Sequence, residues 1–175
     1  MRIRAVTLLT SLVTVGALVV GASVAESAGA KGAPKAAPCA GSTKATAIKQ
    51  IKSAYDFFLN GTTKPPRTND VRQGYISGMS DPALAAVFQK NFVANAAQAA
   101  MTSVKIKSVT CTAKDKATVK GDLILGGKPV AGIFPSPAFA VIENGIWKAS
   151  KQTFCDLVSL SDSTVAQAGQ PCAVQ

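Results

Sequence analysis

The sequence predicts an α+β domain in which N-terminal helices pack on a curved, four-stranded antiparallel sheet, followed by a short C-terminal helix. Two observations predict this order. From residue 42 to Met101 the apolar side chains recur at helical spacing, and after Met101 the period shortens to two, as in half-buried strands. Helices covering one face of a curved sheet would leave a cone-shaped cavity between the first helix and the sheet.

Three helical segments are expected before the sheet. The first spans residues 42–59 and ends at Asn60-Gly61, where both residues accept a left-handed backbone. A short second helix begins at Thr68-Asn69-Asp70 and ends at Gly78. The third begins at Ser80-Asp81-Pro82, with proline at the first helical position, and runs toward Met101.

Four strands are expected after Met101, at residues 104–112, 117–125, 130–142 and 146–150. Pro135-Ser136-Pro137 interrupts the third strand, and prolines at such a place imply an edge or a bulge. Asn144-Gly145 is the strongest hairpin signal in the chain, which makes Trp147 a core or cross-strand residue of that hairpin. The helical triplet Phe154, Leu157 and Val158 predicts the final helix.

The composition divides the chain into four parts. Residues 1–25 are typical of a secretory signal peptide, with two early arginines, an uncharged apolar run and small residues before a cut after Ala25 or Ala30. A membrane anchor is the alternative, although Ser, Thr and Gly make the run only moderately apolar. Residues 26–41, rich in Ala, Gly, Pro and Lys, predict a mobile linker; residues 42–160 form one domain and residues 161–175 a disulfide-tethered tail.

The charge predicts an acidic partner. The chain has 19 basic and 9 acidic residues; cleavage after Ala25 leaves 17 and 9, a net charge of +8. An anionic cell-envelope polymer, reached through the basic linker, is one candidate. The lysines are scattered and lack interleaved aromatic residues, so they also fit a solvated surface, and we expect no nucleic acid partner. No stable membrane span is expected after signal cleavage.

The chain has no histidine and four cysteines. The absence of histidine removes the usual general base near neutral pH and excludes Ser-His-Asp and Cys-His catalysis. An even number of cysteines in an exported chain predicts two disulfides, and without CxxC spacing we expect no metal site and no cofactor. Three pairings are open, of which chain order favours Cys155 with Cys172 and Cys39 with Cys111.

Two kinds of site are conceivable inside the cone. An apolar ligand could be bound by large side chains, which would otherwise simply fill the core of a small domain. The alternative is a small hydrolase-like or isomerase-like enzyme that uses a carboxylate, with Asp56 beside Tyr55 as the candidate pair. The candidate pocket residues are Tyr55, Phe58, Phe88, Phe92 and Trp147.

Three features carry a resemblance to a known family: the amphipathic first helix, the segment ATVKGDLIL at residues 117–125, and the NG-x-W-K-x-S pattern at residues 144–150. Over Ile48 to Leu160 the chain resembles the mycobacterial low-molecular-weight secreted antigens of the twelve-kilodalton type. The resemblance implies a nuclear-transport-factor-two-like fold and an exported or cell-envelope protein without assigned catalysis. The four cysteines and the longer C-terminal tail depart from that antigen, and no functional residue is carried over from the family.

Overall fold

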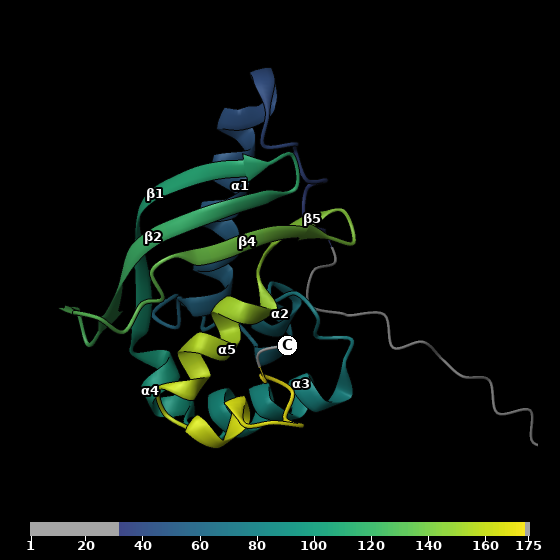
Figure 1. Cartoon of the computed structure of the whole chain (residues 1–175). Helices are drawn as coiled ribbons and strands as arrows, with labels where there is room; N and C mark the ends of the chain where they lie inside the picture. Colours follow the sequence, from purple (N-terminus) through teal and green to yellow (C-terminus); the bar gives the residue numbers. More distant parts are fainter. Residues whose placement is uncertain (1–31, 174–175) are drawn as a thin grey trace, which may run out of the picture.

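The computed structural model describes residues 32–173, and the predicted signal peptide lies outside them. The fold is the predicted α+β arrangement: helices come first, a curled antiparallel sheet follows, and a short helix comes after it. Figure 1 shows α1 crossing behind the sheet, with the shorter helices gathered below it. None of the helices within residues 32–173 combines the length and the apolar character needed to cross a membrane.

Helix α1 (Lys44–Leu59) extends from a 3-10 turn at Gly41–Thr43 and buries one side against the sheet. It stops at Asn60, whose φ of −81° is extended rather than left-handed. Gly61 is required for a different reason, because a side chain there would collide with the carbonyl oxygen of Ala99. The amide of Gly61 donates instead to the carbonyl of Thr102, at 2.8 Å, and so ties the end of α1 to the start of the sheet.

The predicted second and third helices are shorter and more broken than expected. α2 (Asn69–Gly74) is capped by Thr68 and α3 (Pro82–Phe88) by Asp81, as the sequence indicates. The predicted third helix then continues as a π-helical turn (Gln89–Val93) and as α4 (Ala96–Ala100). Ile76, expected in the second helix, instead forms a parallel bridge with Ala149 and extends the sheet by one short contact.

The sheet runs in the order β1-β2-β4-β5, and its strands are antiparallel. The bounds are β1 (Thr102–Ala113), β2 (Lys116–Leu125), β3 (Lys128–Val130), β4 (Ala138–Glu143) and β5 (Ile146–Ala149). The turn at Asn144-Gly145 has φ of 53° and 73°, the left-handed values that a two-residue hairpin turn requires. The predicted hairpin is therefore confirmed, with Ile142 opposite Trp147.

The predicted third strand is two strands. β3 ends at Val130 and β4 begins at Ala138, so the two prolines of residues 135–137 lie between strands rather than at a bulge within one. Proline has no N–H to donate to a ladder, which ends pairing at this point. Both pieces return to β2, with Val130 opposite Leu123 and Val141 opposite Lys116.

Helix α5 (Lys151–Ser159) begins directly after β5, capped by the hydroxyl of Ser150. The main-chain N–H of Phe139 donates to the hydroxyl of Thr153, on the first turn of α5, at 2.7 Å. The main-chain carbonyl of Phe139 accepts from the hydroxyl of Tyr55, also at 2.7 Å. These two bonds join α5 and α1 to β4. Below the sheet, the rings of Phe58, Phe88, Phe92 and Phe154 form one cluster, with centroids 4.9 to 6.3 Å apart.

The described part of the predicted linker packs against the domain. The indole N–H of Trp147 donates to the carbonyl of Ala37 at 2.9 Å, and the carboxamide of Gln50 bonds both Ala37 and Lys35. Cys39 is buried and forms a disulfide with Cys111 on β1. The expectation of a mobile linker therefore does not hold from Lys35 to Cys39, because backbone bonds and a covalent bond hold this segment.

Candidate functional site

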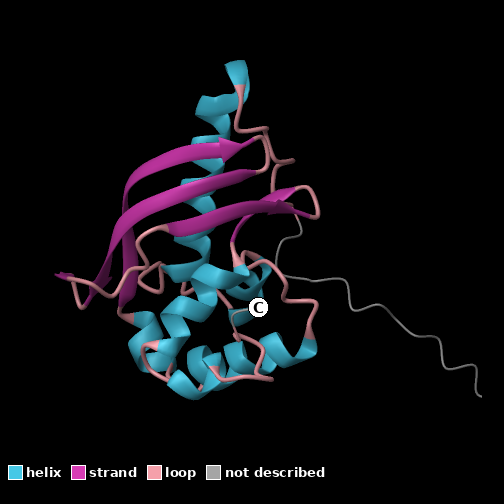
Figure 2. Ribbon diagram, in the orientation of Figure 1, coloured by secondary structure: helices cyan, strands magenta, loops and turns pink. Residues whose placement is uncertain are grey.

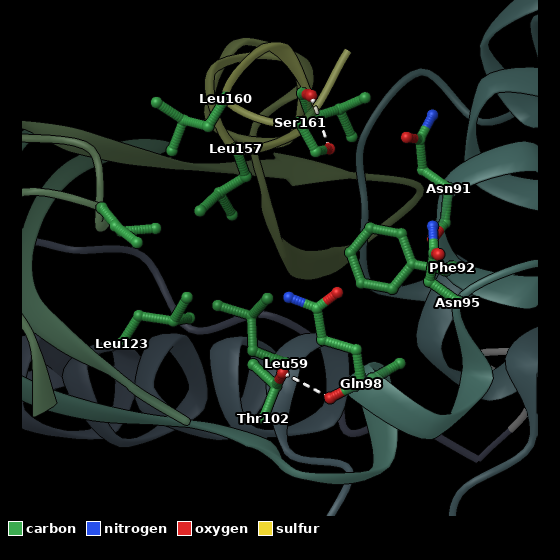
Figure 3. Close-up of a pocket in the computed structure, with 13 residues that line it drawn as sticks. Leu59, Asn91, Phe92, Asn95, Gln98, Thr102, Leu123, Leu157, Leu160 and Ser161 are labelled. Carbon is green, nitrogen blue, oxygen red and sulfur yellow. Dashed lines mark hydrogen bonds between the residues drawn. The ribbon is translucent and has the colours of Figure 1, made fainter. Parts of the chain in front are cut away.

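An open pocket of about 260 Å³ lies at the helical end of the sheet. Figure 3 shows its walls: the end of α1, the π-helical turn and α4 on one side, β2 on the other, and the end of α5 across the opening. The described residues that line it are Leu59, Asn91, Phe92, Asn95, Gln98, Ala99, Thr102, Leu123, Ile133, Leu157, Val158, Leu160 and Ser161.

The pocket is apolar with a polar, uncharged rim. Its leucine, valine and phenylalanine side chains come from α1, the π-helical turn, β2 and the end of α5, its isoleucine comes from the loop between β3 and β4, and its polar side chains are amides and hydroxyls. The side-chain NH2 groups of Asn91 and Asn95 each donate once to a helix carbonyl, which fixes their orientation. Their oxygens, and the whole carboxamide of Gln98, have no partner in the part of the chain that the structure describes, and they can bond a ligand.

The π-helical turn is what brings Phe92 to this pocket. An extra residue per turn rotates the side chains that follow it, and such turns often accompany functional sites. Phe92 lies stacked on Phe88 at 4.9 Å, with Phe154 at 6.0 Å from it. One side of its ring is held by the core, and the half-buried side chain lines the pocket.

A buried arginine supports this wall from behind. Arg72 is 4 % exposed, and its guanidinium donates to the carbonyls of Phe58 and Leu59 at the end of α1. Its central carbon lies 5.5 Å from the centroid of the Phe92 ring. Burial, and to a smaller extent the charge of Arg67, lower the pKa of Arg72. Arg72 thus satisfies helix carbonyls and fixes Phe92, a role that no sequence pattern indicated.

The five predicted pocket residues do not surround one cavity. Tyr55, Phe58 and Phe88 are fully buried in the core, and of the five only Phe92 lines the larger pocket. Trp147, 2 % exposed, lies at a smaller pocket of about 170 Å³, next to residues of α1 and the N-terminal segment. The sequence could not show which large side chains fill the core and which line a cavity.

The candidate pair of Asp56 and Tyr55 does not converge, because the two side chains point in opposite directions. The hydroxyl of Tyr55 points into the core toward Phe139, and burial raises the pKa of this phenol. Asp56, the next residue on α1, points the other way and forms an ion pair with Arg67 at 2.6 Å. Burial also raises the pKa of Asp156 on α5, but this carboxylate is not among the residues that line the larger pocket.

The four cysteines form two disulfides, Cys39–Cys111 and Cys155–Cys172, the pairings that chain order favours. They are therefore not metal ligands. Within residues 32–173, no group of three or more histidine, cysteine, aspartate or glutamate side chains is placed to hold a metal ion.

Comparison with known proteins gives one match. The family of the low molecular weight antigen MTB12, C-terminal domain, matches residues 43–165. No curated protein and no solved structure matches the chain. The likeness to a nuclear-transport-factor-two-like fold therefore stays a prediction.

Proposed function

This chain belongs to the family of the low molecular weight antigen MTB12, C-terminal domain. We propose that it is an exported protein that binds a small, mainly apolar molecule without converting it. The pocket at the helical end of the sheet carries this proposal. Export is supported by the two disulfides, since disulfides persist mainly in oxidising compartments. The signal peptide predicted over residues 1–25 agrees with export.

The chemistry of the pocket favours binding over catalysis. Among the described residues that line it there is no acid, lysine or arginine, and the sequence has no histidine. General acid–base chemistry needs a titratable group within hydrogen-bond reach of the substrate. Amides and hydroxyls can instead orient a bound molecule by hydrogen bonds.

The same features define the class of ligand. Charge on the ligand would be poorly compensated between Phe92, Leu123 and Leu157, because isolated charges are costly to move into apolar surroundings. A neutral molecule with one hydrogen-bonding end would place its apolar part on these walls and its polar end near the carboxamide of Gln98. Figure 3 shows that Gln98 lies at the same edge of the pocket as Thr102. The hydroxyl of Thr102 donates to the main-chain carbonyl of Gln98, so the side-chain carboxamide stays available.

A series of linear alkanols from hexanol to dodecanol tests this proposal. Each buried methylene contributes about 0.8 kcal/mol, so the Kd is expected to fall about fourfold per carbon until the chain outgrows the pocket. Binding is measured by calorimetry, and its location by amide chemical shifts. The matching carboxylates and amines should bind at least tenfold more weakly.

Two variants locate the binding. Leu157→Gln keeps the size of a half-buried wall residue and makes it polar, and Ser161→Trp blocks the opening from an exposed rim position. Both should weaken alkanol binding tenfold or more, while Met101→Gln, at an exposed apolar residue outside the lining, should change it less than twofold. The proposal would be refuted by a Kd that does not depend on the chain length of the alkanol, or by an equal loss of alkanol affinity in all three variants.

A further inference from the structure

The outer face of the hairpin β1–β2 is polar, basic and open. The ladder places Ser108 opposite Lys120 and Thr110 opposite Thr118 on this face, while Val109 and the fully buried Val119 face α1. Figure 2 shows the helices behind and below the sheet, with none in front of this hairpin. We define the lysine face as Lys105, Lys107, Ser108, Thr110, Lys116, Thr118 and Lys120.

The charge on the lysine face is mostly uncompensated. The nearest acid is Asp122, which lies opposite Lys105 in the ladder and is bonded to Lys107 at 2.8 Å. Lys105, Lys116 and Lys120 are exposed and form no ion pair with any residue between 32 and 173. Lys114 and Lys128 add exposed positive charge at the two ends of β2, against Asp115 in the turn.

The lysine face is also long, and its register shifts at Lys107. Successive outward residues on a strand are about 6.6–6.8 Å apart, so Lys116 and Lys120 are separated by about 13 Å with Thr118 between them. β1 and β2 have 12 and 10 residues, and the Cys39–Cys111 disulfide fixes the turn end of the hairpin. Ordered lysines on such a strand present charges in a row rather than as a point.

From this arrangement we propose that the lysine face is a docking surface for an extended polymer that carries phosphate groups along its chain. Ammonium groups bind phosphate as point charges, and the hydroxyls of Ser108 and Thr110 can donate to the remaining phosphate oxygens. The hydroxyl of Thr118 can do so when it turns away from the main-chain carbonyl of Thr110, which accepts from it at 3.5 Å. A single exposed ion pair contributes little binding free energy. A polymer that binds several lysines at once gains affinity, because each contact holds the next phosphate close to its own lysine. The row of lysines therefore matches a repeating anion better than a small one.

A membrane surface fits this face less well. Membrane-binding surfaces combine basic residues with apolar side chains that enter the lipid. The large exposed apolar residues that the structure describes are Val93, Met101 and Leu160, and they lie outside the lysine face. Phe139 and Val141 of β4, next to it, are half-buried. Charge without an apolar anchor indicates a soluble or wall-bound polymer.

The probe is linear inorganic polyphosphate, bound to the purified chain with both disulfides formed. The triple variant K105Q/K116Q/K120Q should raise the Kd at least tenfold and make the dependence of log Kd on log salt concentration shallower. The matched control K44Q/K49Q/K52Q removes three exposed lysines from α1, on the other side of the sheet, and should raise the Kd less than threefold. An equal loss of polyphosphate affinity in the two triple variants would overturn the proposal, because the net charge of the protein alone would then explain binding.

Two further arms decide the chemistry of the partner. Poly-L-glutamate of equal charge should bind at least fivefold more weakly than polyphosphate. The variant T110V/T118V should reduce this difference in Kd between the two polymers, and it should leave the dependence of log Kd on log salt concentration unchanged. Equal binding of the two polymers would overturn the phosphate assignment. Tighter binding to phosphatidylglycerol vesicles, lost in the first triple variant, would overturn the polymer in favour of a membrane. Alkanol binding in the pocket should be unchanged in all these variants, so this proposal and the proposed function can fail separately.

Discussion

The two ends of the β1–β2 hairpin are built differently. At the turn end, the row that crosses the inner face of the sheet consists of Cys111, Ala117, Ala140 and Ala149, all small side chains. At the opposite end, the sheet presents Val104 opposite Leu123, and beyond them lie the phenylalanine cluster and the pocket. Small side chains leave room for α1 against the sheet, whereas the large ones at the other end pack toward the phenylalanine cluster.

Each end also has its own disulfide. Cys39–Cys111 joins the N-terminal segment to the turn end, where this segment also packs against Trp147. Cys155–Cys172 joins α5, which lines the pocket, to the C-terminal tail. The turn end therefore combines its disulfide with the single buried indole of Trp147, whereas the pocket end combines its disulfide with a cluster of four phenylalanine rings. If this is right, the two ends respond separately to substitution.

The largest expected effect comes from removing the disulfide of the turn end. Its cysteines are 72 residues apart, and the loop-closure estimate for that length is about 4 kcal/mol. The double variant C39S/C111S should lose this amount of unfolding free energy in urea denaturation, with alkanol affinity in the folded state within twofold of the parent. A loss below about 1 kcal/mol, or a parallel loss of alkanol binding, would show that the two ends are not separate.

The second disulfide should contribute less to stability and more to the pocket. The 17-residue separation of Cys155 and Cys172 gives about 3 kcal/mol by the same estimate. Because α5 supplies Leu157 and Val158 to the pocket walls, C155S/C172S should also weaken alkanol binding severalfold at temperatures where the protein stays folded. Unchanged affinity alongside the expected stability loss would mean that packing alone positions α5.

Substitution of Arg72 tests the pocket end directly. Arg72→Met keeps much of the side-chain length but leaves the carbonyls of Phe58 and Leu59 without their donors, so unfolding free energy should fall by about 2–3 kcal/mol. Arg67→Met is the comparison variant: Arg67 also donates to an α1 carbonyl, that of Asp56, and lies over Phe57, but its carboxylate partner is partly exposed, so the loss should be smaller, about 1 kcal/mol. Chemical denaturation of the two variants gives the comparison. Equal losses would contradict a special role for the buried arginine.

Much of the fold could be predicted because local rules agree with it. Thr68 and Asp81 cap helices, Asn144-Gly145 turns the hairpin, and the change of period after Met101 marks the start of the sheet. The break between β3 and β4 was predicted only as an irregularity, since the prolines at 135 and 137 show where a ladder stops but not that both flanking pieces pair with one strand.

The pocket could not be predicted in the same way. Asn91, Asn95 and Gln98 lie in an alanine-rich segment whose pattern suggests a plain helix, and the π-helical turn that directs them has no signal in the sequence. Ile133 comes from the proline-containing loop, and Leu157 from a helix that was expected to be structural. These residues come together only through tertiary packing. The spacing of apolar residues along the sequence therefore cannot tell a side chain that fills the core from one that lines a cavity.

The smallest expected effect concerns Tyr55, which joins α1 to β4 midway between the two ends. Burial raises its pKa above the ordinary value of about 10, so above that pH the unfolded chain loses a proton that the folded chain keeps. Stability from this group is complete below pH 10 and falls as the pH rises further, by up to about 1.4 kcal/mol per pH unit. Tyr55→Phe should flatten the stability profile between pH 10 and 11 relative to the parent, in urea denaturation at each pH. Because all other residues are the same in both proteins, a difference between the two slopes isolates Tyr55. Parallel slopes would mean that its phenol ionises as readily in the folded protein as in the unfolded chain.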